Sequence, residues 1–160
     1  RESRDAAGNA GIASFKLAFA ADPATDDAFL FTCQRVNVPA IDRSALQRHA
    51  NGATAVAAVV ARRDATSFMT LVARAAGEAF DGSGSVTLAN TVVRPALGSD
   101  PDIVGAGSST LAAIVFAVES LARAKDALDS GGINHTNDGM RLVVPPAAGQ
   151  GAVFIFEERS

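Results

Sequence analysis

The residues of this sequence that can carry chemistry are few and widely separated. Histidine occurs twice, at His49 and His135, and cysteine once, at Cys33. His49 lies in a polar segment, where it can either orient a substrate carboxylate or carbonyl or cap the strand that follows. His135 fits a polar surface turn. Cys33 alternates onto the face of Phe29 and Phe31, so we expect a buried, inert thiol, since a nucleophilic cysteine would need a nearby base.

Two further side chains are candidates for binding a ligand. Gln34 ends the strand that contains Cys33, so its amide can reach into a pocket or lie in solvent. Arg94 lies within an apolar strand, and a buried guanidinium needs an anionic partner because an unpaired buried charge is costly. That partner is either a ligand carboxylate or a carboxylate of the protein itself, at Asp81, Asp100 or Asp102.

Composition narrows the class of protein. The chain has 160 residues, of which 48% are hydrophobic and 19% charged, as in folded globular domains. The net charge of −3 and the scattered basic residues argue against a nucleic-acid partner. No apolar run approaches the roughly 20 residues of a membrane span. A single cysteine fits a reducing compartment, so we expect a cytoplasmic protein without disulfides.

The elements that position these residues recur along the chain. Residues 54–61 form an apolar run, followed by Asp64 as a helix cap, an amphipathic stripe, and strand-like segments at 85–88 and 91–95. The plan returns 56 residues later: an apolar run at 110–117, a cap at Ser120, a helix that ends at Gly131, and strands at 141–145 and 152–156. The sequence therefore predicts two β-α-β-β units, with room for one more short strand in each.

The first part of the chain matches only the end of such a unit. Residues 14–19 and 29–33 are strand-like, and Phe29-Leu30-Phe31 matches Phe154-Ile155-Phe156 at an offset of 125. We interpret residues 1–36 as the closing hairpin of an incomplete unit, completed by a missing N-terminal segment or by another chain. The alternative is an ordinary hairpin packed on the domain. An open sheet edge there predicts association, as a homodimer.

Three stretches follow one another in a recognisable order. Residues 31–34 read Phe-Thr-Cys-Gln, residues 49–53 His-Ala-Asn-Gly-Ala and residues 139–146 Gly-Met-Arg-Leu-Val-Val-Pro-Pro. Together with the repeated units, from about residue 12 to 158, they resemble the bacterial glyoxalase-like domain proteins of the vicinal oxygen chelate superfamily, which have four units. The resemblance implies an α+β fold of βαβββ modules in a curled mixed or antiparallel sheet. It places modules at 54–98 and 110–160, with linkers at 37–53 and 99–109.

The same resemblance implies where a metal would bind. Members of the superfamily hold a divalent metal with His, Glu or Gln from the opening and closing strands of each module. Those positions fall here on the side chains of Ala58, Ala113, Ile155 and Leu30, none of which binds a metal. Glu157 shares the face of Ile155 and is the one weak candidate. We therefore expect no cofactor in this segment.

Two hypotheses of function remain. In the first, the chain is a metal-free cup that binds a small organic, carboxylate-bearing ligand through Arg94, His49, Gln34 or Glu157, or serves as the scaffold half of a larger protein. In the second, it belongs to a glyoxalase-like or extradiol-dioxygenase-like enzyme whose Fe, Mn, Ni or Zn site lies in an absent half. A weaker variant is metal-independent catalysis by His49 with Cys33 or Gln34. We favour binding over catalysis.

Overall fold

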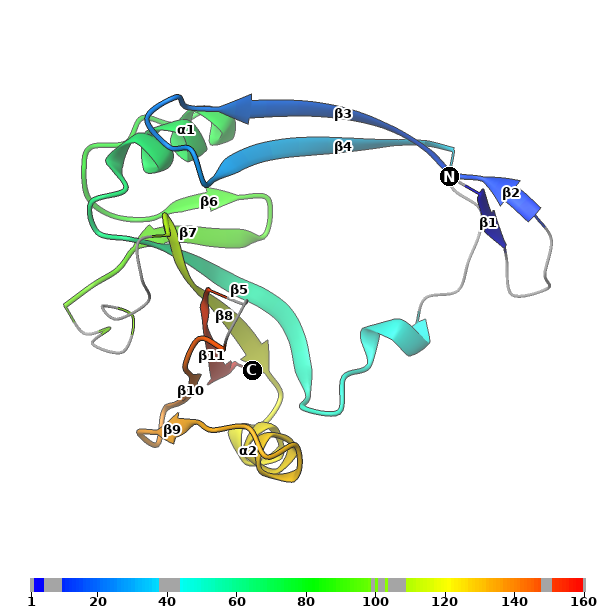
Figure 1. The fold of residues 1–160 in the computed structure, drawn as a ribbon, viewed down its shortest axis with the longest axis vertical. Coiled ribbons are helices and arrows are strands. Elements are labelled where there is room, and N and C mark those ends of the chain that lie inside the picture. The colour runs from blue at the N-terminus through cyan, green and yellow to red at the C-terminus, as the bar shows by residue number, and fades with distance from the viewer. Residues whose placement is uncertain are drawn as a thin grey trace.

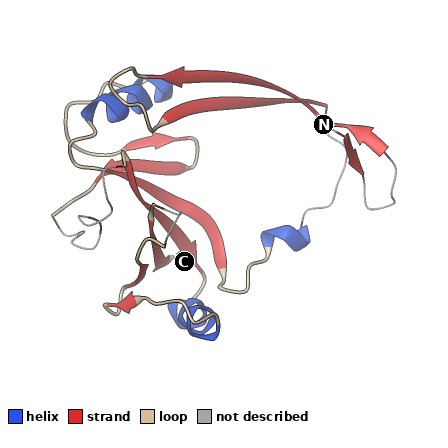
Figure 2. Ribbon diagram, in the orientation of Figure 1, coloured by secondary structure: helices blue, strands red, loops and turns tan. Residues whose placement is uncertain are grey.

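The computed structural model describes residues 2–4, 10–37, 44–98, 100, 103, 109–147 and 151–159. The fold is α+β: strands predominate, two helices accompany them, and the main sheet is mixed and curled (Figures 1 and 2). The predicted fold class is confirmed at this level. Parts of the two predicted linkers, 38–43 and 99, 101–102 and 104–108, lie outside the described residues, as does Asp102.

Seven strands form the central sheet, in the order β6-β7-β5-β8-β11-β10-β9. In chain order they are β5 (Ala53–Ala61), β6 (Val86–Leu88), β7 (Thr91–Pro95), β8 (Leu111–Val118), β9 (Thr136–Asn137), β10 (Arg141–Val144) and β11 (Val153–Glu158). The two central strands, β5 and β8, are antiparallel. β5 is parallel to β7 on its other side, and β8 is parallel to β11. β5 therefore pairs with the strand that comes just before β8 in the chain, and β8 pairs with β11, the last described strand.

Two helices connect these strands. α1 (Thr66–Ala76) follows β5 and α2 (Leu121–Ser130) follows β8, giving a first unit β5-α1-β6-β7 and a second unit β8-α2-β9-β10-β11. The described part of the first unit thus has one strand fewer than the second. The strands fall within a few residues of their predicted positions, because apolar runs bounded by glycine and proline define them well.

Both helices pack on the same face of the sheet, which we call the helix face. Val93 packs under α1 and Phe156 under α2, and the strand register places them on one side. The opposite face carries the largest apolar cluster, which includes Val60, Val115 and Ile155. The β5–β8 pairing shifts register at three places, and such bulges increase strand twist, which accounts for the curl.

The helix caps differ between the units. Ser120 caps α2 as predicted, since its hydroxyl accepts a hydrogen bond from the Arg123 N–H at 3.3 Å. The predicted cap at Asp64 is wrong: α1 begins at Thr66, and the Asp64 carboxylate pairs instead with Arg62 at 2.6 Å. Neither helix is long and apolar enough to cross a membrane, and the described residues contain no other candidate.

β3 (Ser14–Ala21) and β4 (Phe29–Asn37) form a separate antiparallel hairpin, which we call the arm. Its turn is held to the body: the Asp27 carboxylate accepts hydrogen bonds from the main-chain N–H and the hydroxyl of Thr110, the first at 2.7 Å, and Leu30 packs against the cluster under α1. From there the arm extends away from the sheet (Figure 1). A short hairpin of β1 (Glu2–Arg4) and β2 (Ala10–Ile12), which the sequence did not predict, and a single 3-10 turn, η1 (Ser44–Gln47), complete the described elements.

The expected burial of Cys33 is wrong. Cys33 lies on the arm opposite Leu17, and its side chain is exposed. The alternation that places it beside Phe29 and Phe31 is correct. Burial fails because no helix among the described elements covers that face of the arm, whereas α2 covers the equivalent face of β11.

The anchor of the arm gives a first prediction. Asp27→Ala removes the acceptor of the Thr110 N–H, so amide hydrogen exchange at Thr110 is expected to accelerate about tenfold, which corresponds to the loss of one charge-assisted hydrogen bond. Hydrogen exchange followed by NMR measures it. Asp26→Ala is the control, because that neighbouring exposed carboxylate has no hydrogen bond to a described residue. Unchanged exchange at Thr110 in Asp27→Ala would contradict the anchor.

Candidate functional site

The structure distributes the predicted site residues over three places instead of gathering them at one. Arg94 and Glu157 lie on the opposite face of the sheet, His49 lies at the edge of the helix face, and Gln34 and Cys33 lie on the arm. No hydrogen bond or ion pair between described residues joins these groups. The proposed catalytic combination of His49 with Cys33 or Gln34 therefore has no geometric support.

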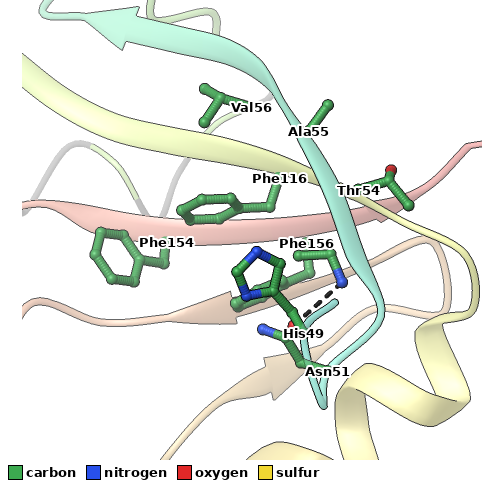
Figure 3. A pocket seen from close by; sticks show the side chains of 9 residues that line it. His49, Asn51, Thr54, Ala55, Val56, Phe116, Phe154 and Phe156 are labelled. Carbon is green, nitrogen blue, oxygen red and sulfur yellow. Dashed lines mark hydrogen bonds between the residues drawn. The ribbon is translucent and has the colours of Figure 1, made fainter. Parts of the chain in front are cut away.

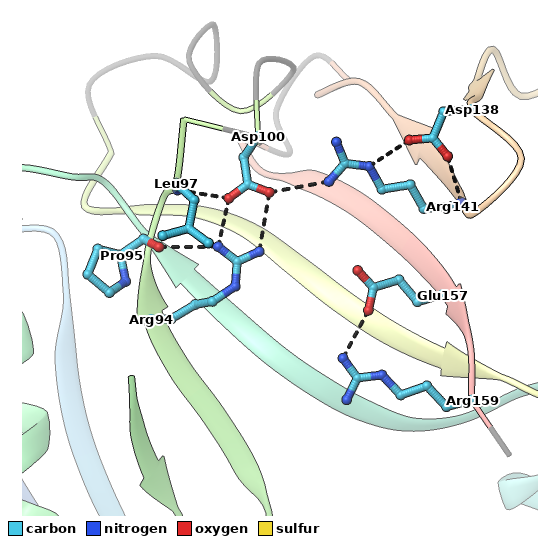
Figure 4. Close-up of polar contacts among 8 residues, drawn as sticks. All are labelled: Arg94, Pro95, Leu97, Asp100, Asp138, Arg141, Glu157 and Arg159. Carbon is cyan, nitrogen blue, oxygen red and sulfur yellow. Dashed lines mark hydrogen bonds and ion pairs between the residues drawn. The ribbon is translucent and has the colours of Figure 1, made fainter. Parts of the chain in front are cut away.

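Arg94 forms an ion pair with Asp100, one of its three predicted partners (Figure 4). Its guanidinium donates to both carboxylate oxygens, at 2.7 and 3.3 Å, and Asp100 is only 3% exposed. Asp100 also accepts a hydrogen bond from the Leu97 N–H at 2.9 Å and pairs with Arg141 at 3.2 Å. The charge of Arg94 is thus balanced by a carboxylate of the protein itself, so its ion pairing does not require a ligand.

This network is balanced in charge. Arg141 also pairs with Asp138 at 3.0 Å, so two guanidinium groups meet two carboxylates. Burial opposes ionisation of Asp100, but the hydrogen bonds from Arg94 and from the Leu97 N–H outweigh it, and the pKa of Asp100 is lowered. The network therefore links the segment after β7 to β10, and it is structural.

Glu157, the weak metal candidate, pairs with Arg159 at 2.9 Å. On the same face, three of the four positions implied for metal ligands converge: Ala58, Ala113 and Ile155 belong to one apolar cluster with Ile103. The fourth, Leu30, lies on the arm and packs against the separate cluster under α1. The side chains of Ala58, Ala113 and Ile155 are apolar and buried, so their cluster is a core. Within the part of the chain that the structure describes, no three His, Cys, Asp or Glu side chains gather as metal ligands do.

A pocket of about 330 Å³ opens on the helix face instead (Figure 3). It lies where the beginning of β5 passes the ends of β8 and β11. Its lining combines a polar turn with apolar strand residues: His49, Asn51, Ala53, Thr54, Ala55, Val56, Phe116, Phe154 and Phe156. Of the predicted site residues, His49 alone lines it.

Three phenylalanines form the apolar wall. Phe116 meets Phe154 edge to face, with ring centroids 5.5 Å apart and planes at 87°, and stacks on Phe156 at 5.4 Å and 22°. Phe156 is buried under α2, whereas Phe116 and Phe154 are only partly buried. The pairing of β8 with β11 places Phe116 beside Phe156. The wall therefore offers ring faces and edges on which a flat apolar group can pack.

The polar rim of the pocket is a tight turn held from behind. The Gly52 N–H donates to the His49 carbonyl at 3.0 Å, and Gly52 has a φ of 72°, a conformation that favours glycine. Arg123 of α2 donates to the carbonyls of His49 and Ala50, at 3.2 and 3.1 Å. A side chain on Gly52 would also crowd Arg123, since its Cβ would lie 3.3 Å from Cδ. Arg123 thus positions the turn.

This turn presents two hydrogen-bonding side chains to the pocket. The Asn51 Oδ1 accepts from the Ala53 N–H at 3.1 Å, which fixes the amide and leaves its Nδ2 without a partner among the described residues. The His49 ring has no hydrogen bond to a described residue either, and in Figure 3 it points toward the phenylalanine side chains. Both groups can donate to a ligand oxygen.

Sequence reasoning missed most of this pocket. It singled out His49 but neither the aromatic wall nor Arg123. The wall was detectable in part, because Phe154 and Phe156 alternate onto one face of a predicted strand, but nothing in the sequence places Phe116 beside them. No pattern in the sequence pointed to Arg123, because the turn whose carbonyl groups it binds lies 73 residues earlier in the chain.

No protein-family model, no curated protein and no solved structure matches this chain.

The Asp100 network gives a second prediction. Asp100→Ala leaves two partly buried guanidinium groups without their shared carboxylate, so the free energy of unfolding at pH 7 is expected to fall by about 3 kcal/mol. Because the pKa of Asp100 is lowered by folding, its contribution is complete above the unfolded pKa of about 3.9 and is lost as the pH falls through the folded pKa.

Urea denaturation of wild type and variant at pH 7 and at pH 3 measures both effects. The difference between the two proteins is expected to be smaller at pH 3. Asp138→Ala is the matched control: its carboxylate pairs with the same Arg141 but is 46% exposed, so its loss is expected to cost less than the loss of Asp100. Equal losses in the two variants would contradict a dominant role for Asp100.

Proposed function

We propose that this chain is a glyoxalase-like module protein of the vicinal oxygen chelate type that binds a small organic carboxylate and does not act as a metal enzyme. The order of elements supports the family: each opening strand is parallel to its closing strand, and the two opening strands lie side by side. The second unit has the order β-α-β-β-β. Three of the four implied metal positions, Ala58, Ala113 and Ile155, share one cluster, which supports the alignment, whereas Leu30 packs in another cluster.

The observation that carries the proposal is the pocket on the helix face. An aromatic wall of Phe116 and Phe154 faces a rim of His49 and Asn51 (Figure 3). An apolar lining with a few fixed polar groups is the usual composition of small-molecule sites, and about 330 Å³ is at the lower end of their sizes. We infer a ligand with a flat ring and one carboxylate: the ring packs on the phenylalanines, and the His49 and Asn51 N–H groups donate to the oxygens.

The preference for binding over catalysis rests on the opposite face. The positions at which a module of this type would hold its metal carry alanine and isoleucine side chains, and these are packed as core. Glu157 is engaged by Arg159. The predicted ligand contacts of Arg94, Gln34 and Glu157 are replaced in this proposal by contacts of His49 and Asn51.

The proposal predicts weak but selective binding of aromatic carboxylates. Phenylacetate and benzoate are expected to bind, and the neutral benzyl alcohol to bind at least about fivefold more weakly, because its one uncharged oxygen is a weaker acceptor for His49 and Asn51 than the two charged oxygens of a carboxylate. Phe116→Ala is expected to weaken binding about tenfold and His49→Ala about fivefold. Ligand-observed NMR titration measures the dissociation constants.

His135→Ala is the matched control, because it removes the other histidine, which does not line the pocket. Binding that is lost equally in His135→Ala and His49→Ala would contradict the assignment of the site. Equal affinity for benzyl alcohol and phenylacetate would contradict the carboxylate.

Metal content gives an independent prediction. After incubation with Mn, Fe, Ni or Zn and desalting, elemental analysis is expected to find well under one metal per chain, because Ala58, Ala113 and Ile155 offer no ligand. A stoichiometric metal that is lost in Glu157→Gln would overturn the binding proposal in favour of a metal enzyme. Glu158→Gln is the control for a change of charge at the neighbouring position.

A further inference from the structure

One face of the arm is apolar and uncovered. The cross-strand pairs Leu17–Cys33 and Phe19–Phe31 lie on it, and Phe29 and Phe15 extend it to either side. The Phe19 ring lies 5.8 Å from those of Phe29 and of Phe31. Phe19, Phe29 and Phe31 are 64, 57 and 56% exposed. Four phenylalanines on one exposed face form a larger apolar patch than a scattered surface residue does, and such patches mark interaction sites.

The second unit shows that this face has the composition of a packing face. Phe29 and Phe31 correspond to Phe154 and Phe156 in sequence, and both pairs lie in the closing strand of a hairpin. In the second unit α2 covers the hairpin, and Phe156 is only 5% exposed. On the arm, no described element covers the corresponding Phe29 and Phe31, and both are exposed.

The two ends of the arm carry opposite charges. The turn that joins β3 to β4 contains Asp22, Asp26 and Asp27, and Asp26 is exposed. The far end carries Arg35, which pairs across the strands with Phe15 and so belongs to the apolar face, whereas Lys16 pairs with Gln34 and lies on the other face of the arm. An arm with one acidic and one basic end is self-complementary when a second arm lies antiparallel to it.

We propose that two copies of this chain associate through the apolar faces of their arms, packed face to face and antiparallel about a two-fold axis. Arg35 of each copy then lies near the acidic turn of the other. This inference goes beyond the proposed ligand binding and does not depend on it. Two-fold dimers with the same patch on both partners are the commonest oligomers, and antiparallel packing satisfies both the apolar and the charged groups.

The area is sufficient for such a dimer. With about half of each ring exposed, four phenylalanines and Leu17 present about 500 Å² of apolar surface on one arm. Two arms together bury about 1,000 Å², which is the least that a specific interface needs. The dimer is therefore expected to dissociate on dilution and to depend strongly on the aromatic residues at the centre of the patch.

Sedimentation velocity over a dilution series of the whole chain tests the proposal, and Cys33 provides a second readout. We expect a concentration-dependent dimer in wild type and a monomer in Phe19→Ser/Phe31→Ser. Both side chains are exposed, so the variant keeps its fold, which circular dichroism checks. Met140→Ser is the matched control, because Met140 is 78% exposed but lies outside the arm, and this variant is expected to remain dimeric.

The reactivity of Cys33, the sole cysteine, is the second readout. Because Cys33 lies on the face that the dimer covers, its reaction with a maleimide is expected to slow as the protein concentration rises.

Charge reversal tests the antiparallel arrangement. Arg35→Glu and Asp26→Arg are each expected to weaken the dimer about threefold or more at low salt, and the double variant to restore wild-type affinity within about twofold. A double variant weaker than either single one would overturn the antiparallel pairing. A monomer at every concentration, or a dimer that survives Phe19→Ser/Phe31→Ser, would overturn the proposal and leave the face for a strand and helix from a missing N-terminal segment or from another chain.

Discussion

The antiparallel pairing of β5 with β8 is the contact on which the rest of the structure depends. These strands open the two units, and each holds its own closing strand in parallel on its outer side. One register therefore decides which side chains of both units share a face. It brings Val60 opposite Ala113 and Val56 opposite Phe116, so the core and the pocket are built from the same pairing on opposite sides of the sheet. A slip by one residue would exchange the two faces.

The alanines of these strands explain why the two faces differ. At Ala58 and Ala113 a short side chain lets Ile103 and the valines of neighbouring strands pack closely, and the opposite face is filled. On the helix face, between the regions that α1 and α2 cover, Phe116 and Phe154 remain only partly buried. The turn that carries His49 reaches this gap because Arg123 binds its carbonyl groups. The pocket therefore lies on the helix face and not on the face where the resemblance implies a metal.

The strands and helices of the sheet were predictable from the sequence, because hydrophobic periodicity and the capping serine are local signals. Pairing across the units was not. Arg94 had three candidate partners, and the choice of Asp100 depends on where the segment after β7 crosses the sheet. The pocket depends on Phe116, which lies 38 residues before Phe154 and meets it through the β8–β11 ladder. Cys33 was misjudged because alternation identifies a face of a strand but not what covers that face.

The arm and the β10–β11 hairpin show that strands of similar sequence can be covered or exposed. β10–β11 and β3–β4 have similar strands, and both place two phenylalanines of the closing strand on one face. The β10–β11 hairpin is covered by α2 and pairs with β8. The arm, in contrast, is held to the body mainly at its turn, by Asp27 and by Leu30. The same hydrophobic pattern therefore gives a core in one case and an exposed surface in the other. Whether such a strand is buried is decided by the elements that pack on it, since the strand itself cannot cover its own face.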